Sequence, residues 1–415
     1  MDLNKRKIIN DPVFGFFNLQ SELVFDLIEH PIFQRLRRIK QLGLTFQVFP
    51  GANHTRFEHA LGSAYLMRQA ISSLRNKGHI ITEEEAEAVT IAILLHDIGH
   101  GPFSHVMENS LVHISHEEIS ILLMEEINSE ISGKIDLAIK IFKNEYHKKF
   151  LCQLVSGQLD MDRLDYLGRD SFFSGVTEGH VGVDRIIKML NVWNDNLVVE
   201  MKGIYSIEKF LIARRLMYWQ VYLHKTVVSA EFLLINILNR AKELVSQGQK
   251  LFATPSLSIF LEKQFQPNDF RQNIKINNIP VLTHFSLLDD NDIHVSIKVW
   301  QNHSDQVLSY LSKCLINRNL FRVLTSDKPY PSKKIEKLRS TIKSHFNITE
   351  EEIKYFYINQ ELTNSAYSKG SENITVLSKN GKIMDFSDAS DINLSALSKV
   401  VRKFFLCFPK ELDFI

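Results

Sequence analysis

This sequence is short of cysteine, of long apolar runs and of an excess of either charge. Its three cysteines, at positions 152, 314 and 407, are far apart and form no CxxC pair. That spacing argues against a disulfide framework or a zinc–thiolate site and fits a reducing compartment. No stretch approaches the roughly 20 apolar residues that span a bilayer, and the first residues carry no apolar signal core. We therefore expect a cytoplasmic protein with no membrane partner.

The balance of charge also limits the classes of partner. Lysine and arginine number 49 against 48 aspartate and glutamate residues, a formal net charge of +1. Nucleic acid is therefore not expected as the main partner, because binding a phosphate backbone calls for a basic surface. The hydrophobic content of 44% is typical of a globular protein, and a length of 415 residues suits two domains.

The first three quarters of the chain are expected to be mainly helical. Apolar residues recur at helical spacing in several segments, and residues 86–97 are apolar nearly all round, which predicts a buried central helix. Near residues 196–207 the sequence is typical of a short hairpin with Lys202-Gly203 at its tip. We assign this region, residues 1–317, to a helical domain.

The pattern changes near residue 318, where short apolar runs alternate with one helical segment. We expect strands at 320–324 and 353–358, a helix at 332–346, a hairpin at 372–386 with Asn-Gly at its turn, and a final strand at 402–408. The predicted fold class is thus mainly α, with a helical core and a small C-terminal α/β domain at 318–415. We expect that domain to serve assembly or regulation.

Histidine is unevenly distributed along the chain. Eight of the sixteen histidines fall within residues 54–116, and histidine is well suited to both metal ligation and proton transfer near neutral pH. The densest stretch, HDIGHGPFSH at 96–105, directly follows the apolar helix. Its glycines and proline predict that the chain turns out of the helix there.

Three segments together offer ligands for a metal ion: HTRFEHALG (54–62), HDIGHGPFSH (96–105) and DMDRLDYLGRD (160–170). Each places histidine or aspartate at a helix end or on one helix face. The set contains two imidazoles, two carboxylates and no sulfur, which suits Mn, Fe, Zn, Co or Ni, with Mg as a further candidate. The candidate ligands are His59, His96, Asp97 and Asp162.

The order His, then His-Asp, then a later Asp resembles the HD-domain phosphohydrolase superfamily. Within it, the segments RFEHALG, HDIGHGPFSH and DMDRLDYLGRD together resemble the deoxynucleoside triphosphate triphosphohydrolase branch. The resemblance covers roughly residues 1–320, and two further parts of the chain agree with it: IFQRLRRIKQLG with VFPGANHTRFEH upstream, and ARRLMYWQVYLHK downstream. The resemblance implies a nucleotide substrate and water attack at its α-phosphorus, which releases deoxynucleoside and inorganic triphosphate. It also implies a homo-oligomer, a dimer or higher.

The resemblance further implies roles for individual residues outside the ligand set. Catalytic roles near the phosphates are implied for His100, His105, His116 and Glu117. Of these, His105 is the first candidate for protonating the leaving oxygen and His116 the second. Phosphate or sugar contacts are implied for Gln41, Arg56, Arg163, Tyr166, Asp170 and Arg214.

Elementary geometry agrees with part of this assignment. Asp162, Tyr166 and Asp170 lie at i, i+4 and i+8 of one helix and so share a face. Asp160 is interpreted as the N-cap of that helix, and Asp165, which lies off the shared face, as a supporting residue.

Two alternative functions stay open at this point. One is another HD phosphohydrolase reaction, on a nucleoside monophosphate, a cyclic nucleotide or an alarmone. The other is a nucleotide sensor that no longer hydrolyses its ligand. The base preference cannot be read from residue types alone.

Overall fold

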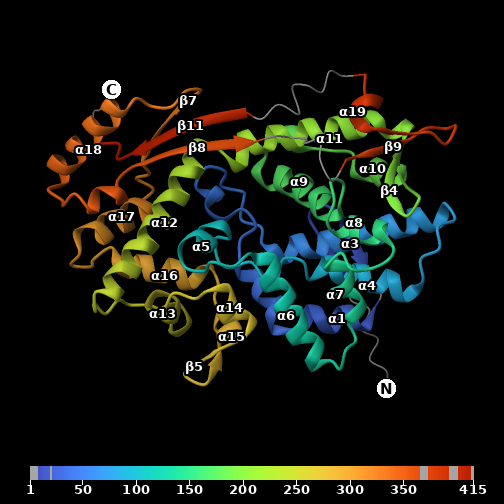
Figure 1. Ribbon diagram of the computed structural model, residues 1–415, viewed down its shortest axis with the longest axis horizontal. Coiled ribbons are helices and arrows are strands. Elements are labelled where there is room, and N and C mark those ends of the chain that lie inside the picture. The colour runs from blue at the N-terminus through green and yellow to red at the C-terminus, as the bar shows by residue number, and fades with distance from the viewer. Residues whose placement is uncertain (1–7, 19–20, 365–372, 392–400, 413–415) are drawn as a thin grey trace.

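The computed structural model describes residues 8–18, 21–364, 373–391 and 401–412, without the side chains of residues 105, 109 and 364. The fold is mainly α-helical with small sheets, so the predicted fold class is confirmed. Strands β7, β8 and β11 lie side by side along one edge of the molecule, next to α12 (Figure 1).

Three helices form the part of the core that matters most for the site. They are α3 (Arg56–Asn76), α4 (Glu83–Leu94) and α9 (Met161–Ser174), and α3 packs against both of the others. Reciprocal hydrogen bonds between Thr and a Glu three residues later fix the starts of α3 and α4. Every residue from Ala88 to Leu95 is buried, which confirms the predicted central helix.

The remaining helices surround this core. They are α1 (Glu22–Glu29), α2 (Pro31–Gln34), α5 (His105–Ser110), α6 (His116–Glu130), α7 (Asp136–Phe142), α8 (Lys149–Val155), α10 (Val183–Met189), α11 (Ile204–Met217), α12 (Lys225–Ser246), α13 (Pro255–Glu262), α14 (Pro267–Arg271), α15 (Val281–Ser286), α16 (Asp290–Trp300), α17 (Gln306–Ile316), α18 (Ser332–Phe346) and α19 (Phe386–Ala389).

The strands form four small sheets among the described residues. β1 (Ile8–Asp11) pairs with β2 (Gly15–Asn18), and β5 (Lys275–Ile276) pairs with β6 (Ile279–Pro280). The other two sheets have the orders β10-β9-β4-β3 and β7-β11-β8. Their strands are β3 (Leu190–Trp193), β4 (Asn196–Glu200), β7 (Arg322–Ser326), β8 (Ile358–Asn364), β9 (Thr375–Leu377), β10 (Ile383–Asp385) and β11 (Val401–Phe408).

The hairpin predicted near 196–207 lies earlier in the chain. β3 and β4 are antiparallel and turn at Asn194 and Asp195, whose φ angles are 46° and 62°. Asn and Asp tolerate this left-handed conformation better than most residues, so they take the turn. Lys202 and Gly203, the predicted tip, belong instead to a short 3-10 turn that leads into α11.

Most of the C-terminal elements occur where they are predicted. The helix is α18, the hairpin is β9–β10 with Asn380-Gly381 between its strands, and the last strand is β11. The strand predicted at 353–358 is wrong: Glu352–Tyr355 is a 3-10 helix, and β8 begins only at Ile358. Thr349 and Glu352 bond to each other there and favour a turn of helix over an extended chain.

The sheet β10-β9-β4-β3 takes strands from both sides of the predicted domain boundary. β9 runs parallel to β4, with Val376 opposite Val199. The boundary near residue 318 therefore stays a prediction. No single helix among the described residues has the length and apolar composition to cross a membrane; 201–222 and 225–246 meet those criteria only as a pair bent by 55°.

Candidate metal centre and its surroundings

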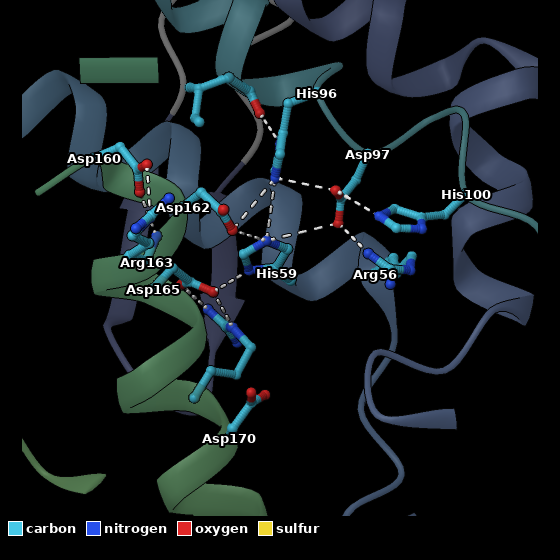
Figure 2. Close-up of polar contacts among 12 residues, drawn as sticks. Arg56, His59, His96, Asp97, His100, Asp160, Asp162, Arg163, Asp165 and Asp170 are labelled. Carbon is cyan, nitrogen blue, oxygen red and sulfur yellow. Dashed lines mark hydrogen bonds and ion pairs between the residues drawn. The ribbon is translucent and has the colours of Figure 1, made fainter. Parts of the chain in front are cut away.

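The four predicted ligands come from the ends of three packed helices. His59 lies in the first turn of α3, His96 and Asp97 follow the end of α4, and Asp162 lies in the first turn of α9. Because these helix ends meet in the core, the four side chains point toward one another (Figure 2). The structure thus brings together residues that are far apart in the sequence.

Donor atoms of these side chains surround a common point. Nε2 of His59 lies 3.1 Å from Oδ1 of Asp162 and 3.3 Å from Nε2 of His96. Nε2 of His96 lies 3.3 Å from Oδ1 of Asp97 and 3.5 Å from Oδ1 of Asp162. Ligand atoms of His59, His96 and Asp97 all fall within 4.8 Å of one another. Such a group is compact enough to hold one metal ion.

The second nitrogen of each imidazole is already bonded, which leaves Nε2 to face the centre. Nδ1 of His96 donates to the carbonyl oxygen of Ile93 at 2.6 Å. Nδ1 of His59 donates to Oδ2 of Asp165 at 2.7 Å. Bonds of this kind fix the tautomer and the orientation of metal-binding histidines.

Asp165 is itself held by a buried chain of charged groups. Arg169 donates to both of its oxygens at 2.9 Å and to Asp11 of β1 at 2.8 Å. All three residues are buried. The supporting role interpreted for Asp165 agrees with this geometry, but nothing in the sequence pointed to Asp11, which is 158 positions from its partner.

Gly62 of α3 leaves the room that Asp165 and Arg169 occupy. A Cβ at position 62 would lie 2.0 Å from Oδ1 of Asp165 and 2.2 Å from Nη2 of Arg169. The absence of a side chain there is therefore a condition for the buried bond between Asp165 and His59.

The charges at the centre call for a cation. Burial alone would lower the pKa of His59, yet its hydrogen bonds to Asp162 and Asp165 raise that pKa to about 10. Burial opposes ionisation of Asp162 in turn, but His59 and His96 hold its pKa well below the usual range. A metal ion would take the place of the proton that these carboxylates stabilise, so the donor set fits a divalent metal. The side chain of Asp162 is 31% exposed, whereas that of His59 is fully buried, so the centre is accessible from the Asp162 side.

A strained turn follows the His-Asp pair. Phe103 and Ser104 have φ angles of 52° and 45°, a region that non-glycine residues rarely occupy. The turn places Oγ of Ser104 2.6 Å from Nη2 of Arg56, while Nη1 of Arg56 pairs with Asp97. The sequence predicts that glycines make this turn, but Gly99 serves packing instead, since a Cβ there would lie 2.2 Å from the carbonyl oxygen of His116.

Beyond Asp97 lies a pair of stacked imidazoles. The rings of His100 and His116 are 3.8 Å apart between centroids, and Nε2 of His100 lies 3.3 Å from Oδ1 of Asp97. Burial and then the charge of Arg56 lower the pKa of His100 to about 3, so His100 is neutral. Nδ1 of His116 donates to Glu108 at 2.7 Å.

The glutamate that bonds to His116 is Glu108, and the catalytic role predicted for Glu117 stays a prediction. The side chain of Glu117 is exposed on the first turn of α6, whereas Glu108 of α5 contacts His116. One signal could have found Glu108: it lies three residues after His105, on the same helix. The side chain of His105 lies outside the described residues, so its role stays a prediction.

Two further arginines meet beside Asp162. Arg163 donates from Nε to Asp160 at 3.1 Å, and Asp160 caps α9, as predicted, by accepting from the backbone N–H of Arg163. Arg163 and Arg214 both donate from Nη1 to Oε1 of Gln158, at 3.4 and 3.3 Å. Among the described residues the buried Nε atoms of Arg56 and Arg214 have no hydrogen-bond partner.

The predicted sugar-binding residues lie farther along α9. Asp170, two helical turns beyond Asp162, accepts hydrogen bonds from His54 at 2.8 Å and from the hydroxyl of Tyr222 at 2.7 Å. The ring of Tyr166 lies edge-on to that of Tyr222, with 6.2 Å between centroids. The side-chain oxygen of Gln41 is buried and, within the described part of the chain, has no partner.

Comparison with known proteins places this chain in a family. A model described as HD domain matches residues 56–167, and one described as HD associated region matches 181–251. A solved phosphohydrolase from Bacteroides thetaiotaomicron is 55% identical, with a TM-score of 0.93 over 97% of this chain and 100% of that one. The uncharacterized protein YwfO of Bacillus subtilis is 33% identical over 99% of this chain and 94% of its own length. The human deoxynucleoside triphosphate triphosphohydrolase SAMHD1 is 31% identical over 53% of this chain and 42% of its own length.

Proposed function

This chain belongs to the HD-domain phosphohydrolases of the deoxynucleoside triphosphate triphosphohydrolase branch, and from that membership we propose that it hydrolyses deoxynucleoside triphosphates to deoxynucleoside and inorganic triphosphate. The observation that carries the proposal is a pair of arginines whose Nε atoms are buried and unpaired. Arg56 and Arg214 each keep a buried Nε donor with no partner among the described residues. Burying an unpaired donor is costly, and a triphosphate would supply the acceptors.

His59, His96, Asp97 and Asp162 would hold the divalent ion, which when bound supplies Lewis acidity toward water and the phosphoryl oxygens. Arg56, already paired with Asp97, would bind the phosphate nearest the ion. Arg163 and Arg214, joined through Gln158, would bind the phosphates farther along the chain. This order would align the α-phosphorus with the ion, so that water adds to this phosphorus as its bond to the 5′ oxygen breaks; the deoxynucleoside is the leaving group and the triphosphate carries the added oxygen.

Proton transfer to the departing 5′ oxygen needs a donor on the phosphate side of Asp97. His116 has the bonding for this role, because Glu108 accepts from its Nδ1 and so fixes the orientation of the ring. His105, which begins α5, remains the other candidate. His100 is suited to hydrogen bonding as a neutral ring, because burial keeps its pKa low.

Gln41, Tyr166 and Asp170 would bind the deoxyribose. The buried oxygen of Gln41 offers an acceptor for a sugar hydroxyl. Tyr166 offers an aromatic face, and Asp170 is held in place by two donors. We also expect a homo-oligomer, for which the exposed side chains of Ile8, Phe16 and Phe172 offer apolar contact surface.

Product identification tests the proposal. Purified protein loaded with Mn²⁺ should release inorganic triphosphate from one or more deoxynucleoside triphosphates, offered singly and in mixtures. His96→Ala is the matched control and should lose metal and turnover together. Release of orthophosphate or pyrophosphate would point to another phosphohydrolase reaction. Tight binding without any product, at full metal occupancy, would point to a sensor.

A further inference from the structure

Gln158 joins two arginines that the sequence predicts as phosphate contacts. Its Oε1 accepts from Nη1 of Arg163 at 3.4 Å and from Nη1 of Arg214 at 3.3 Å. The two arginines come from different helices, α9 and α11, and Gln158 comes from the loop between α8 and α9. One neutral oxygen thus holds two positive groups from separate elements next to each other.

The loop that carries Gln158 is itself fixed. Oδ2 of Asp160 accepts from the backbone N–H of Gly157 at 2.9 Å, while its Oδ1 accepts from the backbone of Arg163. A Cβ at position 157 would lie 2.5 Å from the carbonyl oxygen of Gln153, so the loop packs closely on the end of α8. The position of the Gln158 side chain therefore follows from the backbone around it.

The carboxamide matters because it is uncharged. Two guanidinium groups held together repel each other, and a carboxylate between them would relieve that repulsion by neutralising their charge. A carboxamide orients both groups and leaves that charge available to a ligand. Arg163 already has an acid partner in Asp160, whereas Gln158 is the side chain that bonds Arg214 among the described contacts.

We infer that Gln158 is a positioning residue that presents Arg163 and Arg214 together to the terminal phosphates, and so selects a chain of three phosphates over shorter ones. The inference rests on the proposed function and names the part of the site that recognises substrate length. Gln158 contacts neither the metal ligands nor Arg56 in the described structure. Its loss should therefore weaken phosphate binding without changing the metal centre.

The experiment compares two substitutions at this position. Gln158 also lines an open cavity of about 690 Å³, so Gln158→Ala leaves space that water can fill and the protein should fold. Gln158→Glu keeps the shape but adds a charge that pairs with both arginines. Ser156→Ala is the matched control, because Ser156 lies in the same loop, lines the same cavity and is exposed.

Calorimetry on the metal-loaded protein measures the binding of inorganic tripolyphosphate and of pyrophosphate. Steady-state kinetics give KM and kcat for a deoxynucleoside triphosphate. We expect Gln158→Ala to weaken tripolyphosphate binding about three- to tenfold, Gln158→Glu to weaken it more, and pyrophosphate binding to change less. KM should rise in parallel with little change in kcat or metal content, and Ser156→Ala should match the wild type.

Wild-type affinity for tripolyphosphate in both Gln158 variants would overturn the inference, and so would equal losses for the two anions. Failure of the proposed function looks different. In that case the wild-type protein releases no triphosphate from any nucleotide, while its binding of tripolyphosphate still depends on Gln158.

Discussion

Asp165 and His59 share a hydrogen bond of 2.7 Å between Oδ2 and Nδ1, and both side chains are fully buried. Asp165 is not one of the four candidate ligands, yet its carboxylate decides which nitrogen of His59 is left for a metal ion. Because Arg169 bonds to both oxygens of Asp165, the carboxylate cannot rotate away without breaking a second buried pair.

The first prediction concerns this bond. Asp165→Ala removes the acceptor for Nδ1 of His59, so the ring loses its fixed tautomer and Arg169 loses its partner. We expect the affinity for the divalent metal to fall about 10- to 100-fold, measured by titration against a competing chelator. Asp184→Ala, at an exposed position on α10, is the control. Unchanged metal affinity in Asp165→Ala would contradict the role given to this residue.

A second prediction uses a matched pair of glycines. Gly62→Ala places a methyl group 2.0 Å from Asp165 and should cost about 1–3 kcal/mol of unfolding free energy, with loss of metal affinity. Gly168, on α9, has no atom within 4 Å of an added Cβ. Gly168→Ala should therefore be neutral or stabilise the helix by about 0.5–1 kcal/mol. Urea unfolding of both variants measures these changes in unfolding free energy. Similar changes at the two positions would refute the packing argument.

The pH dependence of metal binding follows from the pKa of His59. That pKa is raised to about 10, so in the metal-free protein the imidazole keeps its proton at neutral pH and a metal ion must displace it. Metal affinity should consequently rise with pH between about 6 and 9, by up to about tenfold per unit for one displaced proton.

The same shift predicts the stability of the metal-free protein. A raised pKa stabilises the fold fully below the ordinary value near 6.5, and this contribution is lost as the pH rises toward 10. Thermal unfolding of chelator-treated protein should therefore show a falling Tm over this range that the metal-loaded protein lacks. A metal affinity that does not change with pH would argue against a proton on His59 in the metal-free protein.

The last prediction compares the contributions of Glu108 and Glu117 to turnover. Glu108→Gln replaces the carboxylate that accepts from Nδ1 of His116 with an uncharged amide, so the ring is held less firmly and kcat should fall about 10- to 100-fold while metal content stays the same. A smaller loss is expected from Glu117→Gln, whose side chain is exposed. Steady-state kinetics with metal analysis of both variants provide the test. A larger loss in Glu117→Gln would favour the role that the sequence resemblance implies.

Much of the site could be predicted from the sequence because its residues sit where helices begin or end. The central helix at 86–97 is marked by its apolar composition, and the polar groups that follow it are costly to bury unless they bind something. His59 and Asp162 occupy the first turns of two helices whose capping residues are visible in the sequence. These local signals were enough to group four ligands that the fold then brings together.

The residues that support the ligands could not be predicted in the same way. Asp11 meets Arg169 only because β1 folds back onto α9, and no local pattern reports that contact. Glu117 follows His116 directly in the sequence, but neighbouring residues on a helix point in different directions, and Glu108 approaches from another helix. The sequence predicts that glycines make the turn after the His-Asp pair, whereas Phe103 and Ser104 take the strained conformations.

The parallel pairing of β9 with β4 has a consequence for how this chain can be divided. β4 lies between β3 and β9, and β9 covers its outer side at Val199 and Glu200. A fragment without β9 would leave one side of β4 as an open edge, the kind of surface on which strands of separate molecules pair and aggregate. The C-terminal segment therefore protects this edge of β4, and a shortened protein would need another means of protecting it.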